Sequence, residues 1–194
     1  MIDHSRFEER TITSSMQFSG HLVNLRVDTV RLPDGREARR EVVEHPGAVA
    51  LVAIDDAGCV VLVRQWRHPV GRVSLELPAG TLEPGEDIDT CARRELFEET
   101  GFYPRSVEKL VDIHVSPGYS NEVIHLFVAR ELQVQGDATL PEAAGEWVQD
   151  ADENLQTLTV PLREAVGSCL DGEISDAKTI TGILLAHHLL EGDA

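Results

Sequence analysis

Acidic residues crowd one short stretch of the chain, "GTLEPGEDIDTCARRELFEETGF", residues 80–102. This stretch holds seven acidic and two basic residues. A Pro-Gly pair before it and a glycine near its end predict a helix that starts near Glu86 and stops at Gly101. At about 100° per residue, Glu95 and Glu99 fall within about 20° of the centre of this helix's apolar stripe, where leucine is the usual residue. The pattern therefore indicates carboxylates that face the protein interior.

Such a cluster of carboxylates needs positive charge nearby. Glu98 lies at the edge of the same helix face, so three carboxylates share it. Two charges about 6 Å apart repel by roughly 3 kcal/mol at an effective dielectric near 20, and desolvation adds to that cost. Arg94, one turn before Glu98, can orient it, but one arginine cannot balance three acids. Oxygen ligands favour a hard cation, Mg²⁺ or Mn²⁺. A solvated acidic face is the alternative, and the helix dipole alone can explain Asp87 and Asp89 in the first turn.

The composition excludes several classes of protein. The 194 residues carry a net charge of −17, from 17 Lys+Arg and 34 Asp+Glu, which argues against nucleic acid or an anionic membrane as partner. The cysteines, Cys59, Cys91 and Cys169, form no Cys-x-x-Cys pair and are odd in number. A disulfide framework is therefore not expected. We expect the protein to reside in a reducing cytoplasm. We expect neither a signal peptide nor a membrane-spanning helix, because no apolar run is long enough.

Apolar and polar periodicity predicts the elements that must position these acids. Expected strands are 21–31, 38–44, 48–54, 59–66, 107–116, 122–131 and 157–160, with a short segment at 75–80 that ends in Gly. Expected later helices follow Pro161 and a Ser175 cap. An Asp-Gly turn joins the first two strands into a hairpin. The "HPG" at 45–47 separates an N-terminal β-hairpin region, 1–45, from a main domain, 46–194. The order of strands and helices predicts an α/β (α+β) fold with a mixed sheet.

The acidic stretch resembles the signature of the Nudix hydrolases, G-x5-E-x7-R-E-U-x-E-E-x-G-U, in which U is a bulky apolar residue. All nine fixed or class positions match: Gly80, Glu86, Arg94, Glu95, Leu96, Glu98, Glu99, Gly101 and Phe102. The resemblance implies an α/β/α sandwich around a mixed sheet. It also implies hydrolysis of a nucleoside diphosphate linked to another group.

The resemblance further implies how a divalent metal is held, Mg²⁺ in the first place and Mn²⁺ as the alternative. Glu95 and Glu99 would be ligands, joined by the backbone carbonyl of Ala79. Glu98 is implied as an additional ligand and a catalytic candidate, and Glu86 as an outer contributor.

Further segments resemble one branch of this family, the ADP-ribose pyrophosphatases: residues 39–55, 60–72, 75–80 and 116–122. In that branch the N-terminal β region exchanges with a second subunit, and arginines of both subunits hold the substrate. By this resemblance Arg40 contacts the adenine end of the substrate and Arg67 contacts its diphosphate. Ser116 and Glu122 match the substrate-binding loop. An ordinary surface salt bridge is the alternative for both arginines.

Two positions of the resemblance leave alternatives open. The branch often carries an aromatic residue that stacks on adenine after an N-terminal glycine, whereas here Gly20 is followed by His21. Imidazole stacks less extensively, so the preferred base is open. A mobile loop of the branch supplies a glutamate that activates water, and Glu153 aligns with it. Asp150 and Asp152 are close alternatives for this role. A solvated acidic loop without a catalytic role is the remaining alternative.

The sequence therefore predicts metal-dependent hydrolysis of ADP-ribose to AMP and ribose 5-phosphate by a cytoplasmic homodimer. Another nucleoside diphosphate sugar is the alternative substrate. A nucleotide-sugar-sensing module with a degenerate site is the alternative class, and the complete signature argues against it. The net charge disfavours an mRNA-decapping enzyme, and the absence of a Cys-rich zinc region disfavours an NADH-type pyrophosphatase.

Overall fold

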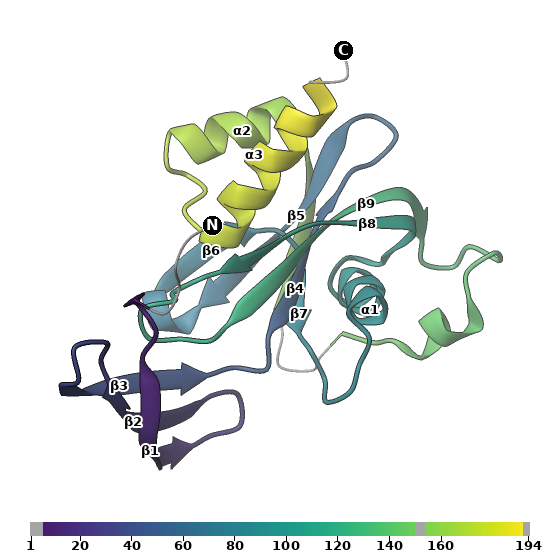
Figure 1. Ribbon diagram of the computed structural model, residues 1–194. Coiled ribbons are helices and arrows are strands. Elements are labelled where there is room, and N and C mark those ends of the chain that lie inside the picture. Colours follow the sequence, from purple (N-terminus) through teal and green to yellow (C-terminus); the bar gives the residue numbers. More distant parts are fainter. Residues whose placement is uncertain (1–5, 150–153, 192–194) are drawn as a thin grey trace. The chain divides into compact units, whose positions relative to one another are not determined.

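The chain is described by a computed structural model over residues 6–149 and 154–191. It divides into two compact units, which are described separately. The first comprises Met1–Pro46 and His114–Val123, and the second comprises Gly47–Ile113 and Ile124–Ala194. Figure 1 labels most elements of both.

The first unit is built on a three-stranded antiparallel sheet in the order β1-β2-β3 (Figure 1). Its strands are β1 (Arg10–Ser19), β2 (Asn24–Arg31) and β3 (Glu37–Glu44). The expected hairpin is present as β2 and β3, joined by a turn in which Gly35 has a φ of 86°. The third strand, β1, was not predicted, because half of its residues are Thr or Ser and all ten are exposed.

A distant segment of the chain completes this unit. Residues 114–123 attach to the end of β3, where the backbone N–H of Val43 donates to the carbonyl of Tyr119 at 2.8 Å. The backbone N–H of His45 donates to Oδ1 of Asn121 at 2.9 Å. The first unit is therefore not one continuous piece of chain.

The second unit holds two sheets. One has the order β7-β4-β9-β8 and the other the order β10-β5-β6. The strands are β4 (Ala48–Ala53), β5 (Cys59–Arg67), β6 (Arg72–Glu76), β7 (Ala79–Thr81), β8 (Phe102–His114), β9 (Val123–Val134) and β10 (Gln156–Pro161). Because β4 pairs with β9 in parallel and with β7 antiparallel, the larger sheet is mixed, as the sequence predicts.

Helices cover both faces of β4, and this makes the α/β/α sandwich. The helices are α1 (Ile88–Thr100), α2 (Leu162–Leu170) and α3 (Ala177–Glu191), with short 3-10 turns η2 (His68–Val70) and η3 (Glu142–Glu146). Val49, Leu51 and Ala53 pack with α1, whereas Ala48, Ala50 and Val52 pack with α2 and α3. Figure 1 shows α1 on one side of β4 and the other two helices on the opposite side. All six residues of β4 are buried, which explains its continuous apolar sequence.

The helix of the acidic stretch begins two residues later than expected. Asp87 is its N-cap and accepts hydrogen bonds from the backbone N–H groups of Asp89 and Thr90. The helix ends before Gly101, whose φ is 73° and whose N–H donates to the carbonyl of Phe97. At α3 the predicted cap, Ser175, is wrong: Asp176 accepts from the backbone N–H of Thr179 instead.

No helix in residues 6–149 and 154–191 is both long and apolar enough to cross a membrane.

Candidate active site

The acidic face of α1 points into the protein. Glu95 and Glu99 are only 9% and 6% exposed, alongside the fully buried Cys91, Ala92 and Leu96. The helical periodicity of the sequence therefore placed both carboxylates correctly on the buried face.

Arg94 is the main counter-charge on this helix. Its guanidinium donates to both oxygens of Glu86, at 2.8 and 2.9 Å, and its Nη1 donates to Glu98 at 2.9 Å. Nη1 also lies 2.8 Å from Oε1 of Glu95. The hydrogen bonds that Arg94 donates to Glu86 lower the pKa of Glu86 and raise the pKa of Arg94. One guanidinium is thus shared among three carboxylates, all partly or fully buried.

The short strand β7 approaches the helix so closely that a side chain at one position would displace the Glu95 carboxylate. A Cβ atom added at Gly80 would lie 1.9 Å from the carboxyl carbon of Glu95. At the preceding residue, the backbone N–H of Ala79 donates to Oε2 of Glu99 at 3.0 Å. From the other side, Oγ1 of Thr157 on β10 donates to the backbone carbonyl of Glu99 at 3.2 Å. The backbone of Ala79 therefore holds the Glu99 side chain, and the Gly80 of the signature has a steric cause in its close approach to Glu95.

The donors here suit a hard divalent cation. Glu95, Glu98 and Glu99 offer only carboxylate oxygens, and the absence of a side chain at Gly80 lets the Glu95 carboxylate lie directly against the backbone of β7. In the described part of the chain, no three His, Cys, Asp or Glu side chains are already grouped as a metal site, and Arg94 supplies the positive charge instead. The backbone N–H of Ala79 donates to Glu99, and the role of the Ala79 carbonyl as a metal ligand stays a prediction.

Arg67, the expected diphosphate ligand, lies at the end of β5. Its Nε and Nη2 donate to the two oxygens of Glu76, at 2.8 and 2.7 Å. Burial would raise the pKa of Glu76, but Arg67 and Lys178 outweigh that effect and lower it to about 2. Glu76 and Lys178 were not singled out from the sequence. A charged residue between Leu75 and Leu77 was the available signal.

The other expected substrate contacts all belong to the first unit. Arg40 donates from Nε and Nη2 to the carboxylate of Glu9, at 2.8 and 2.5 Å. Ser116 accepts two backbone hydrogen bonds in the turn that leads towards Glu122. His21 is exposed beside Gly20.

The expected water-activating residue, Glu153, lies outside the described residues, as do its alternatives Asp150 and Asp152. Trp147 lies shortly before them in the chain. Its ring stacks on Tyr103 with centroids 6.3 Å apart and meets the edge of Phe97 on α1 at 6.2 Å.

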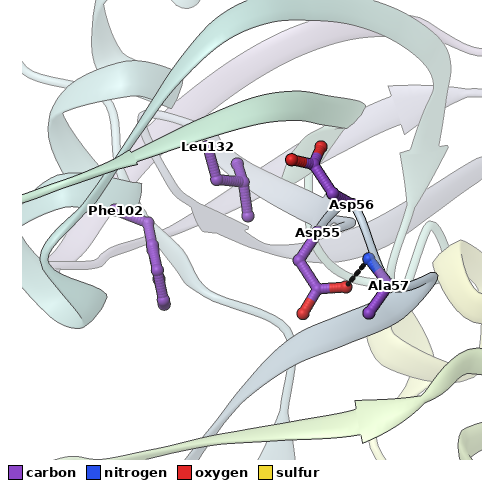
Figure 2. Close-up of a pocket in the computed structure, with 5 residues that line it drawn as sticks. All are labelled: Asp55, Asp56, Ala57, Phe102 and Leu132. Carbon is purple, nitrogen blue, oxygen red and sulfur yellow. Dashed lines mark hydrogen bonds between the residues drawn. The ribbon is translucent and has the colours of Figure 1, made fainter.

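A separate hollow of about 300 Å³ lies at the turn between β4 and β5. Figure 2 shows Phe102 and Leu132 facing Asp55, Asp56 and Ala57. Asp55 uses Oδ1 to accept from the backbone N–H groups of Ala57 and Cys59, so its carboxylate serves the turn. None of the signature acids lines this hollow.

Comparison with known proteins agrees with this geometry. The family model described as "NUDIX domain" matches residues 44–180. The chain is 39% identical to an ADP-ribose pyrophosphatase of Bacillus subtilis and 42% identical to a methanol dehydrogenase activator of Bacillus methanolicus, covering 91% of this chain and of each relative. It is 38% identical to a GDP-mannose pyrophosphatase of Pectobacterium atrosepticum, over 79% of this chain and 78% of that one.

A solved structure shows the same fold. The crystal structure of an ADP compounds hydrolase superposes with a TM-score of 0.80 at 21% identity, and covers 96% of both chains. Together, the matched family, the complete signature and the buried carboxylates on α1 show that this chain belongs to the Nudix family of hydrolases.

Proposed function

We propose that this Nudix enzyme hydrolyses the diphosphate bond of ADP-ribose and releases AMP and ribose 5-phosphate. The carboxylate cluster on α1, in a chain so similar to an ADP-ribose pyrophosphatase over nearly its whole length, carries the proposal. In this reaction the oxygen of water adds to one phosphorus and the bond from that phosphorus to the bridging oxygen breaks. Each product then keeps one phosphate group.

Members of this family generally need a divalent metal ion, and we propose Mg²⁺, with Mn²⁺ as a substitute. Glu95, Glu98, Glu99 and the Ala79 carbonyl would hold it. When bound, the ion compensates the negative charge of the diphosphate. It would also relieve Arg94 as the main counter-charge of the three glutamates.

Glu153 is proposed as the base that takes the proton of the attacking water, with Asp150 or Asp152 as alternatives. Glu98 is a second catalytic candidate, because it sits on the rim of the same cluster. For substrate binding we propose Arg67 at the diphosphate. The second set of proposed contacts lies in the first unit: His21, Arg40, Ser116 and Glu122.

The compartment proposed for this enzyme is the cytoplasm. All three cysteines are free thiols, and the net charge of −17 suits a small metal-bound substrate better than nucleic acid or a membrane surface.

A hydrolysis panel tests the proposal. ADP-ribose, ADP-glucose, GDP-mannose, NADH and nucleoside triphosphates are compared with Mg²⁺ and with Mn²⁺, and products are separated by ion-exchange chromatography. We expect the highest kcat/KM for ADP-ribose, with AMP as product. A higher value for GDP-mannose, the substrate named for one relative, would instead favour that second candidate. Tight binding of ADP-ribose without hydrolysis would favour a sensing module.

A further inference from the structure

A network of buried charges joins the end of β5 to the first turn of α3. Glu76 is 2% exposed and Lys178 is 7% exposed. Lys178 donates to Oε2 of Glu76 and lies 3.1 Å from Oδ2 of Asp176, while Arg67 donates to both oxygens of the same Glu76. Glu76 is thus held between two cations.

The identity of the lysine is informative. The chain has only two lysines, Lys109 and Lys178, against fifteen arginines. Lys109 sits in an exposed pair with Asp112, whereas Lys178 is one of the few charged groups placed in the core. Burying an ammonium group costs several kcal/mol before pairing is counted.

Stability alone is a weak explanation for such a network. Buried ion pairs are often no more stabilising than apolar residues of similar volume. The surrounding contacts of α3 already hold it in place. Oγ1 of Thr179 accepts from the backbone N–H of Leu77 at 2.9 Å, and a Cβ atom at Gly182 would lie 2.6 Å from Cδ1 of Leu77.

The position of the network suggests a role at the site. Leu77 is two residues before Ala79, whose N–H holds Glu99. The hydrogen bond to Glu76 raises the pKa of Arg67, and Asp176 and Glu99 contribute smaller charge effects in the same direction. The Arg67 guanidinium therefore lies within electrostatic reach of the signature helix.

We propose that Lys178 is a positioning residue for diphosphate binding, acting through Glu76 on Arg67. Glu76 takes two of the five N–H donors of Arg67 and fixes the plane of its guanidinium, which leaves the others for a ligand. Lys178 shares the charge of Glu76, so that Arg67 is not fully neutralised by its partner. This inference rests on the proposed contact between Arg67 and the diphosphate.

Steady-state kinetics of Lys178→Met separate this role from a structural one. The variant keeps an unbranched side chain, one atom shorter, and loses its charge, so we expect KM for ADP-ribose to rise about tenfold while kcat changes less than about threefold. Lys178→Arg should recover most of the lost KM. Lys109→Met, the same change in an exposed pair, should leave both constants unchanged. A lower melting temperature with an unchanged KM would overturn the proposal.

A double-mutant cycle tests whether the effect passes through Arg67. In an Arg67→Ala background, Lys178→Met should raise KM no further, because the group on which it acts is gone. Full additivity of the two changes would show that Lys178 acts by another route, and would overturn the proposal.

Lysine-selective ¹³C labelling gives a readout that needs no turnover. With two lysines, the εCH₂ region holds two signals, which Lys109→Met assigns. Saturation with α,β-methylene-ADP-ribose, a non-hydrolysable analogue, should shift the Lys178 signal and leave that of Lys109 in place. Arg67→Ala should abolish the shift. An unmoved Lys178 signal at saturation contradicts the proposal, even if Lys178→Met fails to fold.

The outcomes also distinguish this inference from the proposed function. If the wild-type chain prefers another nucleoside diphosphate sugar, the proposed substrate is wrong, and the same kinetics and analogue binding are run with that sugar. If it hydrolyses ADP-ribose and Lys178→Met leaves KM unchanged, only the role of Lys178 is wrong.

Discussion

Glu99 is buried and accepts a backbone hydrogen bond. A substitution that removes its charge but keeps its shape can therefore test the charge alone. Glutamine at this position keeps an oxygen that can accept from Ala79, but it removes one of the clustered negative charges. We expect Glu99→Gln to lower kcat about a hundredfold or more and to weaken Mn²⁺ binding measured by calorimetry. Its melting temperature in EDTA should equal or exceed that of the wild type, because a buried repulsion disappears.

Glu37→Gln is the matched control, since it makes the same change in an exposed pair with Arg31. It should alter neither turnover nor Mn²⁺ binding. Wild-type turnover by Glu99→Gln at limiting metal would contradict the assignment of Glu99 as a ligand.

A substitution at Gly80 should change the activity of the enzyme without changing its stability. The atoms that an added Cβ would meet are all in the Glu95 carboxylate, the movable end of a side chain. Gly80→Ala should therefore leave the melting temperature nearly unchanged, yet lower kcat/KM at least about tenfold because Glu95 is pushed aside. Gly167→Ala on α2, where nothing lies within 4 Å of the added atom, is the control and should keep full activity. A fully active Gly80→Ala enzyme would show that the position of Glu95 is not critical.

Glu153 is assigned by resemblance alone, so its test must discriminate between neighbours. If it activates water, Glu153→Gln should lower kcat by about two to three orders of magnitude with little change in KM. Asp150→Asn and Asp152→Asn are compared in the same assay. If only one of the three substitutions produces the large loss of kcat, the residue that it replaces is the one that activates water.

The residues of the site differed in how far the sequence could predict them. Glu95 and Glu99 were predictable because helical periodicity is local information. The partnership of Glu76 with Lys178 was not, because these residues are 102 positions apart and meet only when α3 packs against the sheet. The same holds for the hydrogen bond from Thr157 to Glu99, which depends on where β10 lies.

Among the elements, those with a buried face were predicted best. β4 is apolar throughout, β5 is apolar over its first five residues, and α1 has strong terminal signals in Asp87 and Gly101. β1 was missed because only Ile12, Met16 and Phe18 are apolar, and Ser14 interrupts their alternation with polar residues. The N-terminus of α3 was placed one residue early because Ser175 and Asp176 are both good caps, and only the contact with Thr179 decides between them.

The ion pair between Glu76 on β6 and Lys178 on α3 should affect how the free energy of unfolding changes at acid pH. Burial would raise the pKa of Glu76, but Arg67 and Lys178 lower it from its ordinary value of 4.5 to about 2. A lowered pKa means that ionised Glu76 stabilises the fold above about pH 4.5 and that this contribution is lost as the pH falls towards 2. The wild-type free energy of unfolding should thus fall between pH 5 and pH 2.5 by on the order of 2–3 kcal/mol more than that of Glu76→Gln.

Urea denaturation at several pH values measures this difference. Glu37→Gln, which removes an exposed carboxylate, should follow the wild-type curve closely, because exposed ion pairs contribute little. Parallel curves for the wild type and Glu76→Gln would mean that Glu76 does not carry the acid sensitivity.

For the whole molecule, the mixed-sheet sandwich was predicted and is confirmed. The sequence could not show that residues 114–123 join the first unit, since this depends on backbone hydrogen bonds with residues near the end of β3. Local patterns reveal strands, but not which distant segment completes a unit.

The first unit offers a reason to propose a homodimer in which the N-terminal β region, residues 1–45, contacts a second subunit. Every residue of β1 is exposed, and several of the exposed side chains in and beside it are large and apolar: Ile12, Met16, Phe18 and Leu22. An edge strand with such side chains is a ready surface for another chain. We therefore expect a dimer of about twice 21.4 kDa by light scattering.

If that dimer also shares its active sites, Arg40 of one subunit serves the α1 cluster of the other. Arg40→Ala and Glu99→Gln enzymes should each be nearly inactive. After subunit exchange, half of the dimers are mixed, and each mixed dimer has one site free of both changes. Activity should then recover to about a quarter of the wild-type value, whereas each variant exchanged with itself should recover none.

Exchange is verified with differently tagged subunits, because a failure to exchange would imitate a negative result. A fully active monomer would refute the dimer, and verified exchange without recovery would mean that Arg40 acts within its own chain.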